Sequence, residues 1–497
     1  MTSYARLLQI LKQVHLLRST RSLLDWDQQT MMPPGGLEHR SNQLAQLARM
    51  AHEMFTDAAV GDLLDACGDG ADDDERVVLR ETRRSFDRAT RMPASLVAEL
   101  AAARSVGHAR WAEARKASDF STFRPTLENM VALKRRQAEC LGWPDGGEPW
   151  DALADDYEPG CTAQQTEALF EPLRRELVKL IEDLRGGAEP TDALLRLDLP
   201  AEQNRSFVRK ISERLGFEFG RGRLDESAHP FCSGTHCHDV RMTTRFDEPN
   251  PIEPLFSTMH ETGHGLYEQG LPPEHLGTPL GGSISLGIHE SQSRMWENFV
   301  GRSRAFWAWC LPQFQEHFGS AAVRLPLDDA YAGANLVRPG FIRVEADEAS
   351  YNLHIMVRFE IERALINGDL EVADVPAAWN GRYRDYLGLE VRDDARGCLQ
   401  DVHWSSGGFG YFPTYTFGNL YAAQLFEQAR SDLPDLDAQI EEGSFEGLLA
   451  WLREHVHRHG MRYRAAELCE RVTGRTLSAE PLMRHLREKL RPLYGLS

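Results

Sequence analysis

The sequence contains no uninterrupted apolar run of the 18 or more residues that a membrane-spanning helix needs. Its first 19 residues, MTSYARLLQILKQVHLLRS, carry charges within their apolar periodicity, whereas a secretory signal would present one apolar block. We therefore expect a cytoplasmic protein that has no membrane partner.

Cysteine and positive charge are both scarce. Eight cysteines are scattered over 497 residues and no two form a CxxC pair, so neither a disulfide framework nor a cysteine-rich structural zinc site is indicated. Lysine and arginine number 56 against 75 aspartate and glutamate residues, which leaves a formal net charge of −19. Because this charge repels the phosphates of nucleic acids, we expect no nucleic-acid partner.

Helix-forming patterns, in contrast, run along the whole chain. Thr162 and Gln165 form a capping box ahead of an amphipathic stretch over 163–185. Further helices are predicted over 351–367, 374–387, 444–459 and 478–490, and the first two of these stop directly before a glycine. These patterns predict a mainly α protein.

Strands are indicated only between about 215 and 246, where FEFGRGRL and DVRMTTRF alternate. Val240, Met242, Thr244 and Phe246 would share one face of a small β-sheet. Because no long linker or repeat interrupts the chain, we predict a single catalytic unit over 1–497. Within it we expect a lid-like helical region over 1–110 and the metal and substrate site within 215–420.

The segment HETGH carries the most specific chemical signal. His260 and His264 are four residues apart, so on a helix both project from one face and can bind one metal ion. Glu261 beside them is placed to accept a proton from an attacking water, as in HExxH peptidases. Gly263 and Gly265 weaken the helix by up to ~1 kcal/mol each relative to alanine, which indicates close packing at a site.

A catalytic zinc ion usually has three protein ligands and one open position. Glu290, 26 residues after His264, follows a turn long enough for a second helix to pack back against the first, and it is the third ligand that we favour. His289 and Glu297 are the alternatives. For Glu297 we favour a structural hydrogen bond, and for His289 a position beside the ligands.

The segments HETGH and HESQSRMWEN together resemble the carboxypeptidase Taq family of metallocarboxypeptidases. The resemblance extends over about residues 20–420 through LDWDQQTMMPPGG, DDYEPGCT, HPF, DVRMT, IRVEAD and GCLQDVHW. It implies a large helical fold of the gluzincin type with a deep substrate groove, and one Zn²⁺ per chain, with Co²⁺ able to substitute. It also implies a homodimer that removes single C-terminal residues from peptides with broad specificity.

Peptide hydrolysis also needs donors for the developing oxyanion. His403, Tyr411 and Tyr415 lie on the glycine-rich segment HWSSGGFGYFPTY. Similar zinc peptidases use a histidine and a tyrosine about a dozen positions apart, which favours His403 and Tyr415. Aromatic packing under a loop is the structural alternative for each.

An exopeptidase must recognise the free carboxylate of its substrate, for which a bidentate arginine is suited. Arg343 and Arg241, each within a family segment, are the candidates. The structural alternative for Arg343 is an ion pair with Asp347 on one helix face, and for Arg241 it is a cross-strand ion pair. Gln400 and Asp401 are expected to border the substrate site and to orient His403 or the metal ligands.

Three points stay open in the sequence. His229, His236 and His238 cluster with two cysteines; we favour loop histidines near the groove, and a second, adventitious metal is the alternative. A zinc oligopeptidase that cuts internal bonds, or a catalytically inactive helical metal-binding protein, could replace the carboxypeptidase. The presence of Glu261 argues against the inactive protein. A requirement for a free C-terminus on the substrate would distinguish the carboxypeptidase from the oligopeptidase.

Overall fold

The computed structural model describes residues 1–246 and 250–496. The mainly α prediction is confirmed, and one small sheet accompanies the helices. The chain divides into two compact units, each assembled from three segments. No helix in these two ranges is long and apolar enough to cross a membrane. The single catalytic unit and its lid-like region over 1–110 stay predictions.

Unit 1 comprises Met1–Ala89, Thr191–Ala334 and Tyr421–Thr476. Its helices are α1 (Ser3–Thr30), α2 (Leu37–Phe55), α3 (Ala58–Cys67), α4 (Asp73–Arg91, ending just beyond the unit), α9 (Ala201–Arg214), α10 (Glu253–Gly270), α11 (Leu286–Arg294), α12 (Arg304–Phe318), α13 (Leu327–Ala334), α17 (Leu436–Glu441), α18 (Glu446–His455) and α19 (Ala465–Thr473). A π-helix, Met295–Val300, directly continues α11.

Unit 2 comprises Thr90–Pro190, Asn335–Leu420 and Leu477–Ser497. Its helices are α5 (Ala94–Ala117), α6 (Phe120–Leu141), α7 (Pro149–Ala154), α8 (Ala163–Arg185), α14 (Tyr351–Asn367), α15 (Val375–Leu387) and α20 (Glu480–Leu493). Helix α16 (Pro413–Asp432) begins in this unit and continues into unit 1. Two short 3₁₀ helices, Arg343–Glu345 and His403–Ser406, carry predicted site residues.

Local sequence signals account for several helix boundaries. The capping box of Thr162 and Gln165 starts α8 at the predicted residue. Helices α14 and α15 end before Gly368 (φ +90°) and Gly388 (φ +67°), left-handed positions that favour glycine. The predicted helices over 444–459 and 478–490 are present as the shorter α18 and the shifted α20.

The sheet has three strands in the order β1–β3–β2: β1 (Gly222–Glu226), β2 (Phe231–His236) and β3 (Asp239–Thr244). Strand β1 is parallel to β3, and β2 is antiparallel to it. Val240, Met242 and Thr244 are buried, as predicted for one face, whereas Phe246 lies beyond the end of β3 and is half-buried. The predicted strand at FEFG is wrong, because Phe217 turns back so that its ring covers the Cα of Gly222.

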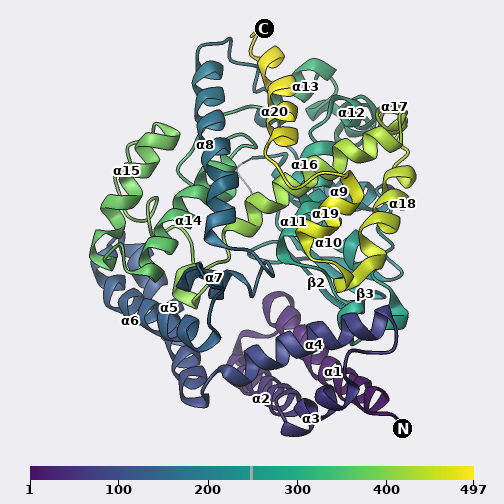
Figure 1. Ribbon diagram of the computed structural model, residues 1–497. Coiled ribbons are helices and arrows are strands. Elements are labelled where there is room, and N and C mark those ends of the chain that lie inside the picture. The colour runs from purple at the N-terminus through teal and green to yellow at the C-terminus, as the bar shows by residue number, and fades with distance from the viewer. Residues whose placement is uncertain (247–249, 497) are drawn as a thin grey trace. The chain divides into compact units, whose positions relative to one another are not determined.

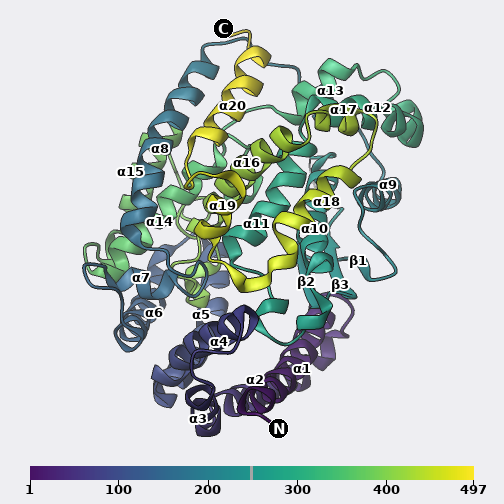
Figure 2. The ribbon, with the colours of Figure 1, turned by 45° about the vertical axis from the view of Figure 1, so that its right-hand side comes forward.

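Helix α10 lies against α11 and against strands β2 and β3 (Figure 1, Figure 2). At Gly263 an added Cβ would lie 2.4 Å from the carbonyl oxygen of Gln292, and at Gly265 it would lie 2.7 Å from the ring of Phe217. The two glycines therefore let α10 approach α11 on one side and Phe217 on the other. This close approach brings the side chains of α10 and α11 together.

Candidate metal centre

His260 and His264 project from one face of α10, with ring centroids 4.9 Å apart. Helix α11 presents Glu290 to both of them. Its Oε2 lies 3.5 Å from Nε2 of His260 and 3.4 Å from Nε2 of His264. Two ligand atoms of a tetrahedral zinc site, each about 2.1 Å from the metal, are about 3.4 Å apart. The three side chains therefore have the spacing of ligands around one ion.

The neighbours of the two imidazoles determine which ring nitrogen carries the proton. Nδ1 of His260 donates to Oε2 of Glu297 at 2.9 Å, which leaves the lone pair on Nε2. Glu268 accepts from Nε2 of His289 at 2.8 Å, so Nδ1 of His289 accepts from Nδ1 of His264 at 2.6 Å. Both Nε2 lone pairs therefore face the carboxylate, and three acceptors converge on one point.

Arg294 keeps the surrounding carboxylates ionised. Its Nε donates to Oε1 of Glu290 at 2.7 Å and its Nη1 to Oε2 of Glu297 at 3.2 Å. Burial would raise the pKa of Glu290, but the guanidinium of Arg294 opposes it, and that pKa stays well below its usual range. Burial lowers the pKa of His264 to about 3. The cluster thus offers a carboxylate and a neutral imidazole at neutral pH.

Glu261 points into the same region with an unused acceptor. The residue is 5% exposed, and its Oε2 is buried without a hydrogen-bond partner among the described residues. Burial raises the pKa of Glu261 to about 7. An unpartnered carboxylate oxygen beside three converging acceptors fits a divalent cation with an adjacent water, so the residues present fit a metal ion.

The predicted oxyanion donors lie together in unit 2. The His403 ring centroid is 5.2 Å from that of Tyr411 and 6.4 Å from that of Tyr415. The two tyrosine rings are 5.4 Å apart. Nδ1 of His403 makes no hydrogen bond to any described residue, and burial lowers the pKa of the ring to about 4. A neutral imidazole and two phenols are thus grouped on one segment.

Arg343 and Asp401 belong to a buried, internally paired cluster. Arg343 donates from Nε and Nη2 to Oδ1 of Asp401 and from Nη1 to the hydroxyl of Tyr351. The other carboxylate oxygen accepts from Arg358, whose Nη2 also donates to Oε1 of Gln400 at 2.7 Å. Arg343 is thus not paired with Asp347, which instead accepts from backbone amides at the start of α14.

Arg241 lies on β3 in unit 1. Its guanidinium pairs with Asp239, two residues earlier on the same strand, at 2.8 and 3.0 Å. It also covers the ring of Trp26 at 4.4 Å. The ion pair therefore runs along the strand and does not cross to a neighbouring one.

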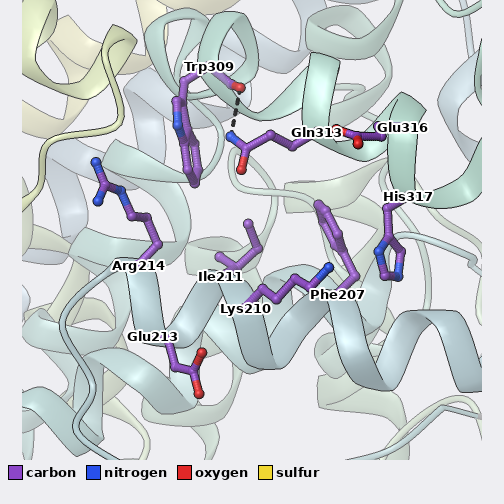
Figure 3. A pocket seen from close by; sticks show the side chains of 9 residues that line it. All are labelled: Phe207, Lys210, Ile211, Glu213, Arg214, Trp309, Gln313, Glu316 and His317. Carbon is purple, nitrogen blue, oxygen red and sulfur yellow. Dashed lines mark hydrogen bonds between the residues drawn. The ribbon is translucent and has the colours of Figure 1, made fainter.

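A separate pocket of about 860 Å³ lies between α9 and α12 (Figure 3). Phe207, Lys210 and Arg214 line it from α9, and Trp309 and His317 line it from α12. No metal-cluster residue lines this pocket, so it is distinct from the metal centre.

Several residues of the metal cluster were not identified from the sequence. Arg294 is four residues after Glu290 on α11, a spacing that could have indicated their contact. Glu268 is likewise one helical turn after His264. Its link through His289 depends on how α11 packs on α10, which no local spacing encodes.

Comparison with known proteins identifies the family of the chain. The chain matches the family described as Carboxypeptidase Taq (M32) metallopeptidase over residues 6–490. It is 44% identical to thermostable carboxypeptidase 1 of Thermus thermophilus and 36% identical to carboxypeptidase 1 of Bacillus subtilis. These matches cover 99% and 98%, respectively, of both chains.

Among solved structures, the M32 carboxypeptidase of Deinococcus radiodurans superposes with a TM-score of 0.95 at 40% identity, covering 99% of this chain and 100% of that one. A Pyrococcus furiosus carboxypeptidase gives a TM-score of 0.95 at 35% identity, covering 99% of each chain. With matches that span nearly the whole sequence and a metal-ligand cluster of the expected composition, the chain belongs to the carboxypeptidase Taq (M32) family of metallopeptidases.

Proposed function

We propose that this metallocarboxypeptidase releases single C-terminal amino acids from peptides, with broad specificity, using one Zn²⁺ held by His260, His264 and Glu290. The observation that carries the proposal is the convergence of three acceptors at 3.4–3.5 Å, with Glu261 beside them. Nitrogen and carboxylate donors suit zinc, and Co²⁺ tolerates the same set.

A zinc ion in this position would polarise the scissile carbonyl and acidify water. Glu261 accepts the proton of the attacking water, because its Oε2 has no other hydrogen-bond partner among the described residues. It then delivers that proton to the leaving amine. Glu297 and His289 keep the two ligand imidazoles in the tautomer that binds the metal.

His403, Tyr411 and Tyr415 are the proposed donors to the oxyanion. Their rings lie within 6.4 Å of one another, which supports a joint role. The neutral state of His403 at pH 7 requires that its N–H, and not a positive charge, stabilise the oxyanion. Asp401 lies 3.7 Å from Nδ1 of His403 and limits the orientation of the ring.

Recognition of the substrate carboxylate is assigned to Arg343 or Arg241, with Gln400 and Asp401 bordering the site. Each guanidinium already pairs with an aspartate, so its orientation is fixed before substrate arrives. Replacing the arginine that binds the substrate, Arg343 or Arg241, by lysine would remove the bidentate contact and raise KM for a peptide with a free C-terminus. A homodimer, a deep substrate groove and a cytoplasmic location stay predictions.

The direct test compares one peptide with a free and with an amidated C-terminus, with products followed by mass spectrometry. The proposal expects a ladder of products shortened one residue at a time from the free peptide and little reaction with the amide. Internal cleavage with equal or better use of the amide would establish an oligopeptidase instead. No hydrolysis by metal-loaded protein would contradict both.

A further inference from the structure

Outside the catalytic cluster, the described residues bring one other group of nitrogen and sulfur ligands together. His236, Cys237 and His238 each offer a ligand atom, and these atoms lie within 4.8 Å of one another. Sγ of Cys237 is 3.8 Å from Nδ1 of His236. A thiolate and an imidazole bound to one zinc ion are about 3.6 Å apart, so little movement would bring the pair to ligand spacing.

We propose that the tip of the β2–β3 hairpin is a second metal site, in which His236, Cys237 and His238 bind a borderline divalent ion such as Zn²⁺. Two imidazoles and one thiolate favour zinc over Mg²⁺ or Ca²⁺, which prefer oxygen ligands. The fourth position is open to water. Binding replaces the S–H proton of Cys237 by the metal and releases that proton to solvent.

The residue types at the hairpin tip are not explained by turn formation. Cys237 and His238 form a two-residue connection between β2 and β3, where Asn-Gly or Asp-Gly sequences are usual. Among the described non-glycine residues only Ser118 has a positive φ, so neither tip residue adopts the backbone of the favoured hairpin turns. An irregular register between Gly234 and His236 closes the connection instead.

The individual side chains are available for coordination. Nδ1 of His236 accepts the backbone N–H of His238 at 2.9 Å, so it carries a lone pair and faces the thiol. A metal would take that lone pair, and water could then satisfy the N–H at the exposed tip. Cys237 is a free thiol, 6% exposed, and His238 is exposed and able to change rotamer.

The surroundings of the tip favour a cation. The Cys237 thiol interacts electrostatically with Glu268 and Glu274, and His238 interacts with Glu218. Arg221 and Arg453 are opposing positive charges, and both pair with Glu218. Helix α1 packs against β2, the strand that carries His236.

Cobalt substitution separates this site from the catalytic one. The catalytic cluster contains no sulfur ligand, so a thiolate-to-cobalt charge-transfer band in the near ultraviolet would report the hairpin alone. The full-length protein, stripped with a chelator, is titrated with Co²⁺ and separately analysed for bound Zn²⁺. We expect the charge-transfer band and two zinc ions per chain.

Two variants and one matched control give the decisive comparison. Cys237→Ser should abolish the band and reduce zinc to one per chain. His238→Ala, at an exposed position that does not endanger folding, should weaken binding at the hairpin by on the order of 100-fold, because even partners of metal ligands contribute roughly 10–100-fold. The control Cys232→Ser, on strand β2, should change neither the charge-transfer band nor the zinc content.

A band that survives Cys237→Ser, or one that disappears with Cys232→Ser, would overturn the proposal. Cys232 is the informative control because its thiol interacts electrostatically with Glu261 of the catalytic cluster. One zinc ion per chain in the wild type, unaffected by Cys237→Ser, would also overturn it. Since the readouts are absorption and metal content, the result does not depend on peptidase activity.

Discussion

Each unit contains one buried charged cluster, and the two clusters surround their carboxylate with different groups. In unit 2, Asp401 lies between Arg343 and Arg358, and each of its oxygens accepts from one guanidinium. In unit 1, Oε2 of Glu290 faces two imidazole nitrogens that carry lone pairs. In the first cluster both oxygens of the carboxylate accept from guanidinium groups, whereas in the second three acceptor atoms converge on one point.

This contrast separates a structural charge network from a metal site. Burying a charge is costly unless a partner neutralises it, so a buried carboxylate that is paired with guanidinium groups needs no metal ion. A network whose acceptors converge without a donor between them requires a ligand. Substitutions in the metal cluster should therefore change activity or metal affinity, whereas a substitution in the Asp401 cluster should change the free energy of unfolding.

The largest effect is expected at Glu261. Glu261→Gln removes the proton acceptor and should lower kcat by roughly 10²–10⁴-fold, because that is the usual contribution of a general base. The variant should bind as much metal as the wild type. Steady-state kinetics and elemental analysis of one preparation measure both quantities. Loss of metal together with activity would show that Glu261 is a ligand.

Asp401→Asn tests the cluster in unit 2 in which a carboxylate is paired with two arginines. Removing the charge leaves Arg343 and Arg358 buried without their anion and should lower the free energy of unfolding by about 3–5 kcal/mol. Denaturant unfolding measures this, and metal content should not change. Asp393→Asn is the control, because Asp393 forms an exposed pair with Arg396 that is worth about 1 kcal/mol or less. Equal effects of the two variants would contradict the comparison.

His289→Ala tests the support of a metal ligand. Without the acceptor for Nδ1 of His264, metal affinity at the catalytic cluster should fall roughly 10–100-fold while stability without metal changes little. Competition with a chelator in a Cys237→Ser background measures it. His317→Ala, on α12 away from the cluster, should leave the affinity unchanged. An unchanged metal affinity in His289→Ala would contradict the role of the hydrogen bonds from His264 through His289 to Glu268 in supporting the metal ligand.

The smallest effect concerns pH and the buried carboxyl of Glu362 in unit 2. It accepts from the indoles of Trp150 and Trp404 and from the amide of Gly410, yet burial raises its pKa from 4.5 to about 8. The folded state therefore keeps a proton that the unfolded state releases. The resulting stabilisation is full below pH 4.5 and is lost as the pH rises through about 8.

Glu362→Gln should remove this dependence. Between pH 6 and 8 the wild type should lose stability relative to the variant by about 1.4 kcal/mol per pH unit at most. Denaturant unfolding at a series of pH values gives the two slopes. Parallel slopes would mean that Glu362 is ionised in the folded protein at neutral pH.

Local patterns were sufficient to predict much of the fold and the grouping of His260, His264 and Glu290. The capping box at Thr162 and the glycines after α14 and α15 act within one or two helical turns, so sequence alone locates them. The spacing of His260 and His264 likewise depends on helix geometry only. Long-range partners were not predicted, because nothing near Arg358 in the sequence indicates Asp401, 43 residues away.

The strand misassigned at FEFG has the same cause. Alternation favours a strand there, but Phe217 finds a better partner in the space left by Gly222 and Gly265. Tertiary packing overrides the local preference. The hairpin cluster of His236 and His238 was visible in the sequence, and the structure shows that its ligand atoms lie within 4.8 Å of one another.

The proposed mechanism depends above all on one metal ion held by His260, His264 and Glu290. Anomalous diffraction at the zinc absorption edge, from crystals of the zinc-loaded active enzyme, tests it most directly. We expect a strong peak within bonding distance of Nε2 of both histidines and of Oε2 of Glu290. Active crystals with no anomalous density between these three atoms would contradict it.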